Sequence, residues 1–395
     1  MPGLDREVMG FPQFNIYSLP LIFLVLQGFF FAGLLIRRYI HKQRIADLFL
    51  ALLVITVGYS CTSYVVGFMD WYDTFPQTKI NYFLFSPEFV VGPLVYLYIR
   101  SIIKPSLPIK KIDWLHFAPA ILYAAYEVFV YVYDASQPGF ADTQNGVWLS
   151  EIHYPIVTTF EYTLGGFSIL LYLAFSIQLY LQYRREIVHF FSNTYEMELG
   201  WLRNFLVVSL LLFCAHQLID IIGSSIADLT WTDTWWTRLA SATAVFYLGI
   251  KGYFTDLTNL YNIPSTQVSS ASLSSDTKQL SEQAAAVLPL IERIMQDSRP
   301  YLKHDLTLSD LAREVGLPAN QLSQIINIQY KKNFNDFINS YRIDAVKTMI
   351  ESREYNHLTL LGIAQECGFN SKATFNRTFK KLTLQTPSEF QAAQQ

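Results

Sequence analysis

Ionisable side chains within apolar stretches are the residues of this sequence whose types and spacing could do chemistry. Such groups are costly in an apolar environment, which makes their presence informative. Carboxylates bind cations, and both carboxylates and imidazole exchange protons. The ionisable residues within the apolar stretches therefore predict a pocket that binds a cationic or polar small molecule, or that responds to protons. Tyr59, Tyr64, Tyr126 and Tyr162 are expected to line its walls. The ionisable residues in question are Glu88, Glu127, Glu161, His216 and Asp220.

A structural role accounts for the same residues equally well. In that interpretation they pair with tyrosine hydroxyls, Gln217, Arg238 or loop backbone and only stabilise the fold. His216 and Asp220 are spaced to share one helix face, which is the best candidate for an intramembrane enzyme site. No nucleophile or metal-ligand motif accompanies that pair, so we expect no enzyme, no catalytic residue, no metal and no cofactor.

Long apolar stretches are the elements that must position these side chains. Hydrophobic residues make up 51% of the 395 residues and charged residues only 15%, which is unusual for a soluble protein. Seven stretches are long enough to cross a hydrocarbon core about 30 Å thick. They are residues 18–36, 46–68, 83–103, 114–133, 156–181, 205–226 and 235–254. The sequence thus predicts an all-α fold that begins with a seven-helix transmembrane bundle.

The placement of Lys and Arg predicts the orientation of this bundle, because these residues are retained on the cytoplasmic side. They are concentrated in the first, third and fifth connections, from Arg37 to Arg203, whereas the other side carries only Arg6, Lys79 and Arg238. We therefore expect a multi-pass protein of the inner (cytoplasmic) membrane, with its N-terminus outside and its C-terminus in the cytoplasm. The ionisable residues then all lie toward the external side, so the predicted pocket faces outward.

The composition changes after the last apolar stretch. Residues 259–283 are rich in Ser, Thr and Gln and poor in large apolar residues, which predicts a flexible linker. Residues 284–395 read as an ordinary amphipathic, charged sequence. The predicted organisation is a sensor domain over residues 1–258, the linker, and a soluble cytoplasmic domain over residues 284–395.

The soluble part contains an internal repeat. LTLSDLAREVGL at residues 306–317 returns as LTLLGIAQECGF at residues 358–369. In each copy a short helix with a central Ala is followed by a Gly, Gly316 or Gly368, and then by a second amphipathic helix, as a helix-turn-helix requires. Residues 333–353 between the copies have apolar residues at helical spacing and predict a rod about 30 Å long. Two recognition helices at such a separation would enter successive major grooves of DNA.

At the motif level, residues 285–395 resemble the DNA-binding domain of the AraC/XylS family of transcription regulators. GFNSKATFNRTFKKLTLQTPSEF, from Gly368 onward, is similar to the family signature, and PYLKHDLTLSDLA and NFNDFINSYRI match common forms. The whole layout resembles family members with an N-terminal multi-pass membrane domain. Leu384 and Lys331 depart from the pattern, since the family usually has Gly at both positions.

The resemblance implies which side chains contact DNA. The first recognition helix would present Asn320, Gln321, Ser323 and Gln324 to the major groove, and the second Lys372, Ala373, Asn376 and Arg377. Asn and Gln pair with adenine and Arg with guanine. Phosphates would be contacted by Lys380 and Lys381, and with less support by Lys331 and Lys332. A solvated helix face is the alternative, although no acidic residue lies between Cys367 and Ser388 to cancel the positive charge.

The sequence therefore predicts a membrane-bound, sequence-specific transcription regulator that couples an external or membrane signal to transcription. Its expected partners are double-stranded DNA, the lipid bilayer and a small-molecule signal. RNA polymerase and a second copy of the chain are further candidates, although two reading helices in one chain do not require a homodimer. A transporter-like bundle whose attached DNA-binding domain reports substrate is the alternative.

Overall fold

The structure of the chain is a computed structural model in which the described residues form helices and no strand. It describes residues 11–83, 87–105, 107–194, 197–255, 277–352, 355 and 357–394. The predicted all-α class is confirmed for these residues. Most of the predicted linker, residues 259–283, lies outside them. The chain divides into two compact units, Met1–Tyr180 with Gly200–Tyr261, and Leu181–Leu199 with Asn262–Gln395.

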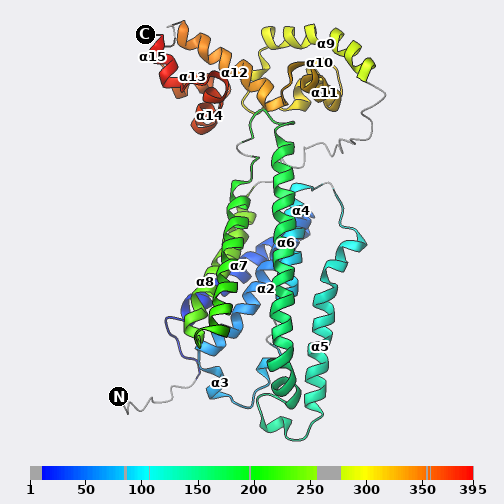
Figure 1. Cartoon of the computed structure of the whole chain (residues 1–395), viewed down its shortest axis with the longest axis vertical. Coiled ribbons are helices and arrows are strands. Elements are labelled where there is room, and N and C mark those ends of the chain that lie inside the picture. Colours follow the sequence, from blue (N-terminus) through cyan, green and yellow to red (C-terminus); the bar gives the residue numbers. More distant parts are fainter. Residues whose placement is uncertain are drawn as a thin grey trace. The chain divides into compact units, whose positions relative to one another are not determined.

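The first unit is a bundle of long apolar helices (Figure 1). Its main helices are α1 (Ser18–Lys42), α2 (Ile45–Phe68), α4 (Glu88–Ile103), α5 (Ala118–Ala135), α6 (Thr158–Ile187), α7 (Gly200–Ser225) and α8 (Trp231–Phe254). The connecting segments are α3 (Trp71–Thr74), η1 (Ile80–Tyr82), η2 (Lys111–Phe117), η3 (Phe140–Asp142) and the π-helical η4 (Leu149–Val157). Helix α6 begins in the first unit and ends in the second.

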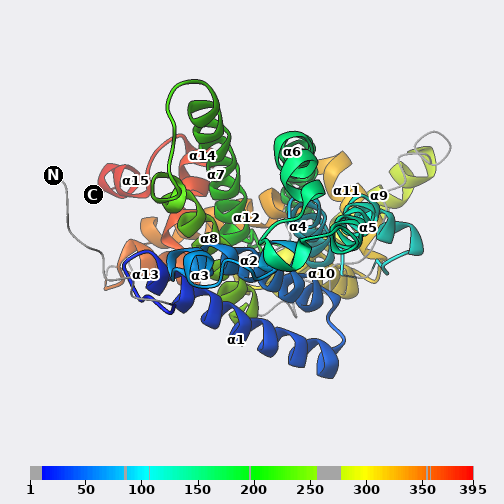
Figure 2. The same ribbon diagram turned by 90° about the horizontal axis from the view of Figure 1, so that it is seen from below.

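Helix α2 is central to this bundle and packs against α1, α4 and α8 (Figure 2). Leu50, Leu53 and Val54 on α2 are fully buried. At one end of the bundle, Arg38 and Asp47 form a buried ion pair with an N–O distance of 2.5 Å. Arg38 also donates to the backbone carbonyl of Gly252 at 2.9 Å, so the ends of α1, α2 and α8 are joined.

Five helical stretches among the described residues are long and apolar enough to cross a membrane, judged by length and composition only. They are Ser18–Lys42, Ile45–Phe68, Lys111–Ala135, Leu149–Ile187 and Gly200–Gly223. Two further predicted spans correspond to α4, which has only 16 residues, and to α8, which includes Arg238 and Lys251. The count of seven spans therefore stays a prediction.

The second unit contains the C-terminal helices and the chain from Leu181 to Leu199. Its helices are α9 (Thr277–Asp297), η6 (Pro300–Leu302), α10 (Leu308–Val315), α11 (Ala319–Tyr330), α12 (Phe334–Glu351), α13 (Leu360–Glu366), α14 (Lys372–Thr383) and α15 (Pro387–Ala393). Helix α12 contributes Phe337 to one buried cluster, with Leu311 and Ile326, and Val346 to another, with Phe375. The predicted helix at residues 333–353 is thus the element shared by two small cores.

Candidate DNA-reading helices and a polar cavity

Helices α10 and α11, the first helix pair, are formed by the first copy of the repeat. Thr307 caps α10: its hydroxyl accepts from the backbone N–H of Asp310 at 3.1 Å, and the Asp310 side chain accepts from the N–H of Thr307, which together form a capping box. Gly316 ends α10 with a φ of 77°, a left-handed conformation that favours glycine. The predicted reading residues of α11 lie on its accessible side: Asn320 and Gln324 are exposed, and Gln321 and Ser323 are half-buried.

Helices α13 and α14, the second helix pair, follow the same plan. Gly368 has a φ of 88°, and a Cβ added there would lie only 2.6 Å from the carbonyl oxygen of Tyr301, so the turn requires glycine. Helix α14 buries Phe375 and Phe379. Its opposite face is exposed and carries all the predicted contact residues of this helix: Lys372, Ala373, Asn376, Arg377, Lys380 and Lys381.

One of these lysines has a partner that the local sequence did not indicate. Lys381 forms an ion pair with Asp336 on α12, at an Nζ–Oδ1 distance of 2.7 Å. Asp336 is distant from Lys381 in the sequence, so the residues around α14 give no indication of this ion pair. Part of the positive charge at the end of α14 is therefore compensated in the folded chain.

Both departures from the family pattern have left-handed backbone. Lys331 has a φ of 51° and Leu384 a φ of 64°. Each is the residue that ends its pair's second helix, α11 or α14. A left-handed conformation costs a non-glycine residue about 1–2 kcal/mol, so glycine is the residue that this backbone favours at both positions.

Comparison with known proteins identifies the C-terminal part of the chain. Residues 311–393 match the family model of a helix-turn-helix domain. Uncharacterized HTH-type transcriptional regulators of Staphylococcus aureus strains COL and MSSA476 are 36% identical to the chain over 90 residues. The match covers 23% of this chain and 12% of each relative. No solved structure matches. The chain carries a DNA-binding helix-turn-helix domain of the kind found in transcription regulators.

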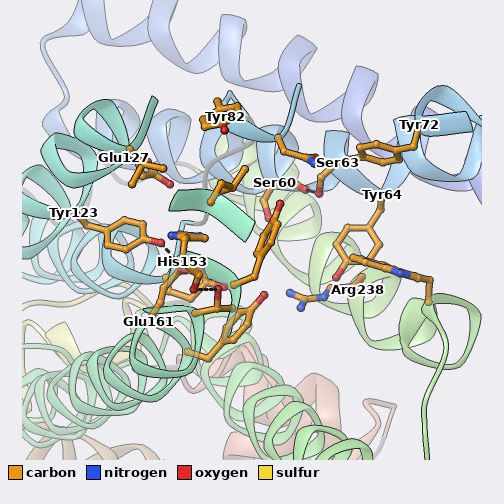
Figure 3. Close-up of a pocket in the computed structure, with 18 residues that line it drawn as sticks. Ser60, Ser63, Tyr64, Tyr72, Tyr82, Tyr123, Glu127, His153, Glu161 and Arg238 are labelled. Atoms are coloured by element: carbon orange, nitrogen blue, oxygen red, sulfur yellow. Dashed lines mark hydrogen bonds between the residues drawn. The ribbon is translucent and has the colours of Figure 1, made fainter. Parts of the chain in front are cut away.

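A polar cavity of about 220 Å³ lies within the first unit. Three of the predicted ionisable residues line it: Glu88 on α4, Glu127 on α5 and Glu161 on α6. Glu127, Glu161, Tyr123 and His153 lie on one side of it, and Tyr64 and Arg238 on the other (Figure 3).

Close helix packing positions two of these carboxylates. A Cβ added to Gly165 on α6 would lie 2.4 Å from the Cβ of Glu88, so glycine permits α6 to approach α4 there. Glu161 lies one helical turn before Gly165 and is 5% exposed. Its Oε2 accepts a hydrogen bond from the Tyr123 hydroxyl at 2.5 Å.

The other two predicted ionisable residues lie outside the described lining of this cavity. His216 and Asp220 line a second cavity of about 220 Å³, which shares Glu88 and Arg238 with the first. Their side chains are 3.7 Å apart. Tyr64 and Tyr162 line the polar cavity, whereas Tyr59 and Tyr126 are absent from its described lining.

Tyr123 and His153 line the polar cavity although the sequence analysis did not select them. Tyr123 lies one helical turn before Glu127, a spacing that places both on one face of α5 and that could have indicated it. His153 lies in η4, whose wide π-helical turns no simple sequence periodicity predicts.

Proposed function

We propose that this chain is a membrane-bound, sequence-specific transcription regulator that couples an external or membrane signal to transcription. In this proposal the apolar helices of the first unit cross the inner membrane seven times. The C-terminal helices lie in the cytoplasm, where both helix pairs act as helix-turn-helix units. The observation that carries the proposal is the exposed basic face of α14 within a segment that matches a helix-turn-helix domain.

The reading chemistry follows from the side chains on that face. Arg377 is exposed on α14 and can donate two hydrogen bonds to the major-groove edge of guanine. Asn376 can pair with adenine in the same way, Lys372 also faces the base edges, and Lys380 neutralises a phosphate. On α11, Asn320 and Gln324 are exposed and offer neutral base contacts.

Genome-wide DNA occupancy of the full-length protein, extracted from membranes at fixed salt, tests this proposal. We expect discrete sites for the native chain, their loss in Arg377→Ala, and their retention in the matched control Arg313→Ala. Arg313 lies on α10 with its side chain 79% exposed, outside the predicted reading residues. Diffuse binding that Arg377→Ala leaves unchanged would contradict sequence-specific reading.

The membrane part of the proposal rests on five candidate spans and on the distribution of Lys and Arg. Single cysteines introduced into a chain in which Cys61, Cys214 and Cys367 are replaced would map the topology. We expect a cysteine at position 79 to react with an impermeant thiol reagent from outside, and one at position 110 only after the cells are opened. The reverse pattern would contradict the orientation.

A transporter-like bundle is the second candidate, and the cavities in the first unit are the observation that favours it. Uptake of labelled solute by vesicles that contain the full chain would support this alternative. We propose no catalytic activity for either unit.

A further inference from the structure

We propose that the polar cavity binds a small organic ammonium ion that carries a hydrogen-bond acceptor at its other end. This inference rests on the proposed function, because it names the chemical class of the signal. The cavity is more than ten times larger than the roughly 15 Å³ that one water needs, so it has room for an organic molecule.

Charge favours a cation in this cavity. Three carboxylates line it, from Glu88, Glu127 and Glu161, whereas Arg238 is the one Lys or Arg residue in its described lining. Tyr64 already lies beneath the Arg238 guanidinium, which is 5.2 Å from the ring centroid. Tyrosine faces elsewhere in the lining, such as that of Tyr123, are suited to an ammonium group.

Two buried polar atoms indicate where the two ends of the ligand would bind. Among the described residues, Glu161 Oε1 and Arg238 Nε are buried and have no hydrogen-bond partner. Such atoms are expensive to bury, and a ligand that pairs with them removes the cost. Glu161 needs a donor, which an ammonium group supplies, and Arg238 needs an acceptor such as a hydroxyl or carbonyl oxygen.

Asp134, in the same unit, is a carboxylate whose contacts are those of a purely structural group. It is fully buried and accepts from the Tyr82 hydroxyl at 2.7 Å and from the backbone N–H groups of Trp148 and Leu149 at 2.7 and 3.1 Å. Both of its oxygens are therefore used. Glu161 differs from it, because no described residue bonds its Oε1, so burial alone does not explain Glu161.

Binding to the purified full-length chain, measured by calorimetry, tests the ligand class with three primary amines: ethanolamine, 3-aminopropanol and tyramine. Tyrosol replaces the ammonium group of tyramine with a hydroxyl and is the neutral control. We expect saturable binding of at least one amine, and binding of tyramine about tenfold or more tighter than that of tyrosol. Saturation by none of the amines, or equal affinity for tyramine and tyrosol, would overturn the proposal.

Variants locate the site. Glu161→Gln and Glu127→Gln keep side-chain shape and should each weaken amine binding about tenfold or more. Asp142→Asn is the matched control, because Asp142 is exposed in the same unit and lies outside the described lining of both cavities. Equal weakening by Asp142→Asn, or none by either glutamate variant in a protein with native thermal unfolding, would overturn the placement. DNA occupancy is measured independently, so failure here leaves the proposed function standing.

A different set of contacts carries a second inference. Residues 188–192, the docking segment, follow α6 and bind the first helix pair and α12 within the second unit. Phe191 and Thr307 form an isolated antiparallel bridge. The carbonyl of Phe190 accepts from the N–H of Leu308 at 2.9 Å, and that of Val188 from the N–H of Asn335 at 3.0 Å. The segment thus satisfies backbone donors in the first turns of α10 and α12.

Side chains strengthen this attachment. Phe190 packs against the core of the first helix pair. Asn335 Nδ2 donates to the carbonyl of Ser192 at 2.8 Å, and Arg342 Nη2 donates to the Ser192 hydroxyl at 3.1 Å. Ser192 is 1% exposed, so the segment is built into the domain rather than resting on its surface.

We infer that the docking segment is the route by which α6 controls the DNA-binding domain. Helix α6 carries Glu161 in the polar cavity and continues directly into the segment. A change in α6 therefore acts on α10 and α12 through hydrogen bonds as well as through the covalent linker. Within the described part of the chain, the docking segment thus connects α6 to the DNA-binding helices in addition to the linker that was expected.

Hydrogen exchange and a transcription reporter on an occupied promoter, both with the full-length chain, test this route. Asn335→Ala should speed exchange of residues 188–192 about tenfold or more, whereas Asn320→Ala should not. Ser192→Ala, which leaves every helix residue intact, should change reporter output at least about twofold at equal protein levels. Rapid exchange of the segment in the native chain, or unchanged output in both Ser192→Ala and Asn335→Ala, would overturn the inference.

Discussion

The two helix pairs share one sequence motif but differ in charge and in what holds them. The first pair presents neutral residues on α11, and its N-terminal end binds the docking segment. The second pair presents Lys372, Arg377 and Lys380 on α14, and the docking segment's backbone bonds go instead to α10 and α12. If the proposed function holds, the two copies divide its tasks: the first would receive the signal through the docking segment, and the second would bind DNA more strongly.

Arg342 on α12 is where the two pairs meet. Its guanidinium donates to the carbonyls of Tyr301 and Lys303, each at 2.7 Å, and to Ser192, and lies 5.8 Å from the ring centroid of Phe369. Burial lowers the pKa of Arg342 to about 10, which leaves it charged at neutral pH. The Tyr301 carbonyl and Arg342 Nε both lie beside the Gly368 turn of the second pair, so this one side chain contacts residues around both pairs.

Of the variants that test how the two pairs differ, Arg342→Met should lower stability the most, because it leaves several buried carbonyls without a donor. We expect the DNA-binding helices to lose about 3 kcal/mol or more of stability. Hydrogen exchange of α10 and α13 in the full chain would measure the loss in both pairs. The exposed control Arg313→Met should stay within about 0.5 kcal/mol. A loss confined to one pair would show that Arg342 does not join them.

Arg377→Ala should come next, and it tests the difference in charge between the pairs. Removal of a bidentate contact to guanine should cost about 1–3 kcal/mol of affinity for a specific site and relax specificity at that base. Gln324→Ala on α11 should cost less, since a neutral contact is weaker. Fluorescence anisotropy with a site found by occupancy would measure both. A larger effect of Gln324→Ala would reverse the assignment of the main reading helix.

The paired lysines of α14 allow a finer test. Lys380→Ala should reduce the slope of log affinity against log salt by about 1, as the loss of one phosphate contact does. Lys381→Ala should reduce it less, because Lys381 is already paired with Asp336. DNA titrations between about 50 and 200 mM salt would measure these slopes. Equal slopes for the two variants would mean that Lys381 leaves Asp336 and contacts a phosphate when the domain binds DNA.

Substitution of glycine at the two left-handed positions should change stability the least of these variants, and the change should be a gain. Leu384→Gly and Lys331→Gly should each raise stability by about 1 kcal/mol, because glycine adopts this conformation without steric cost. Leu384 is 86% exposed, so little packing is lost. Chemical denaturation of the full chain, followed by a probe in the DNA-binding helices, would measure the gain. A loss of stability in either variant would contradict the left-handed assignment.

Much of the DNA-binding part could be predicted from local sequence. The capping boxes at Thr307 and Thr386, the turn glycines Gly316 and Gly368, and the helix between the repeats all depend on residues close together in the chain. The ionisable residues were harder. The position of a residue along a predicted span can be read from sequence, but it does not show which side chains share a cavity. His216 and Asp220 line a different cavity from Glu127 and Glu161.

The sequence by itself determined the helical class, the division into an apolar part and a charged, amphipathic part, and the exposed face of α14, because helix periodicity and hydropathy are local properties. Only the tertiary structure decided that Glu161 has a buried oxygen without a partner, that Lys381 meets Asp336, and that residues 188–192 bind α10 and α12. The last two of these are contacts between residues far apart in the chain. Such pairings depend on how helices pack, and neither composition nor spacing records that packing.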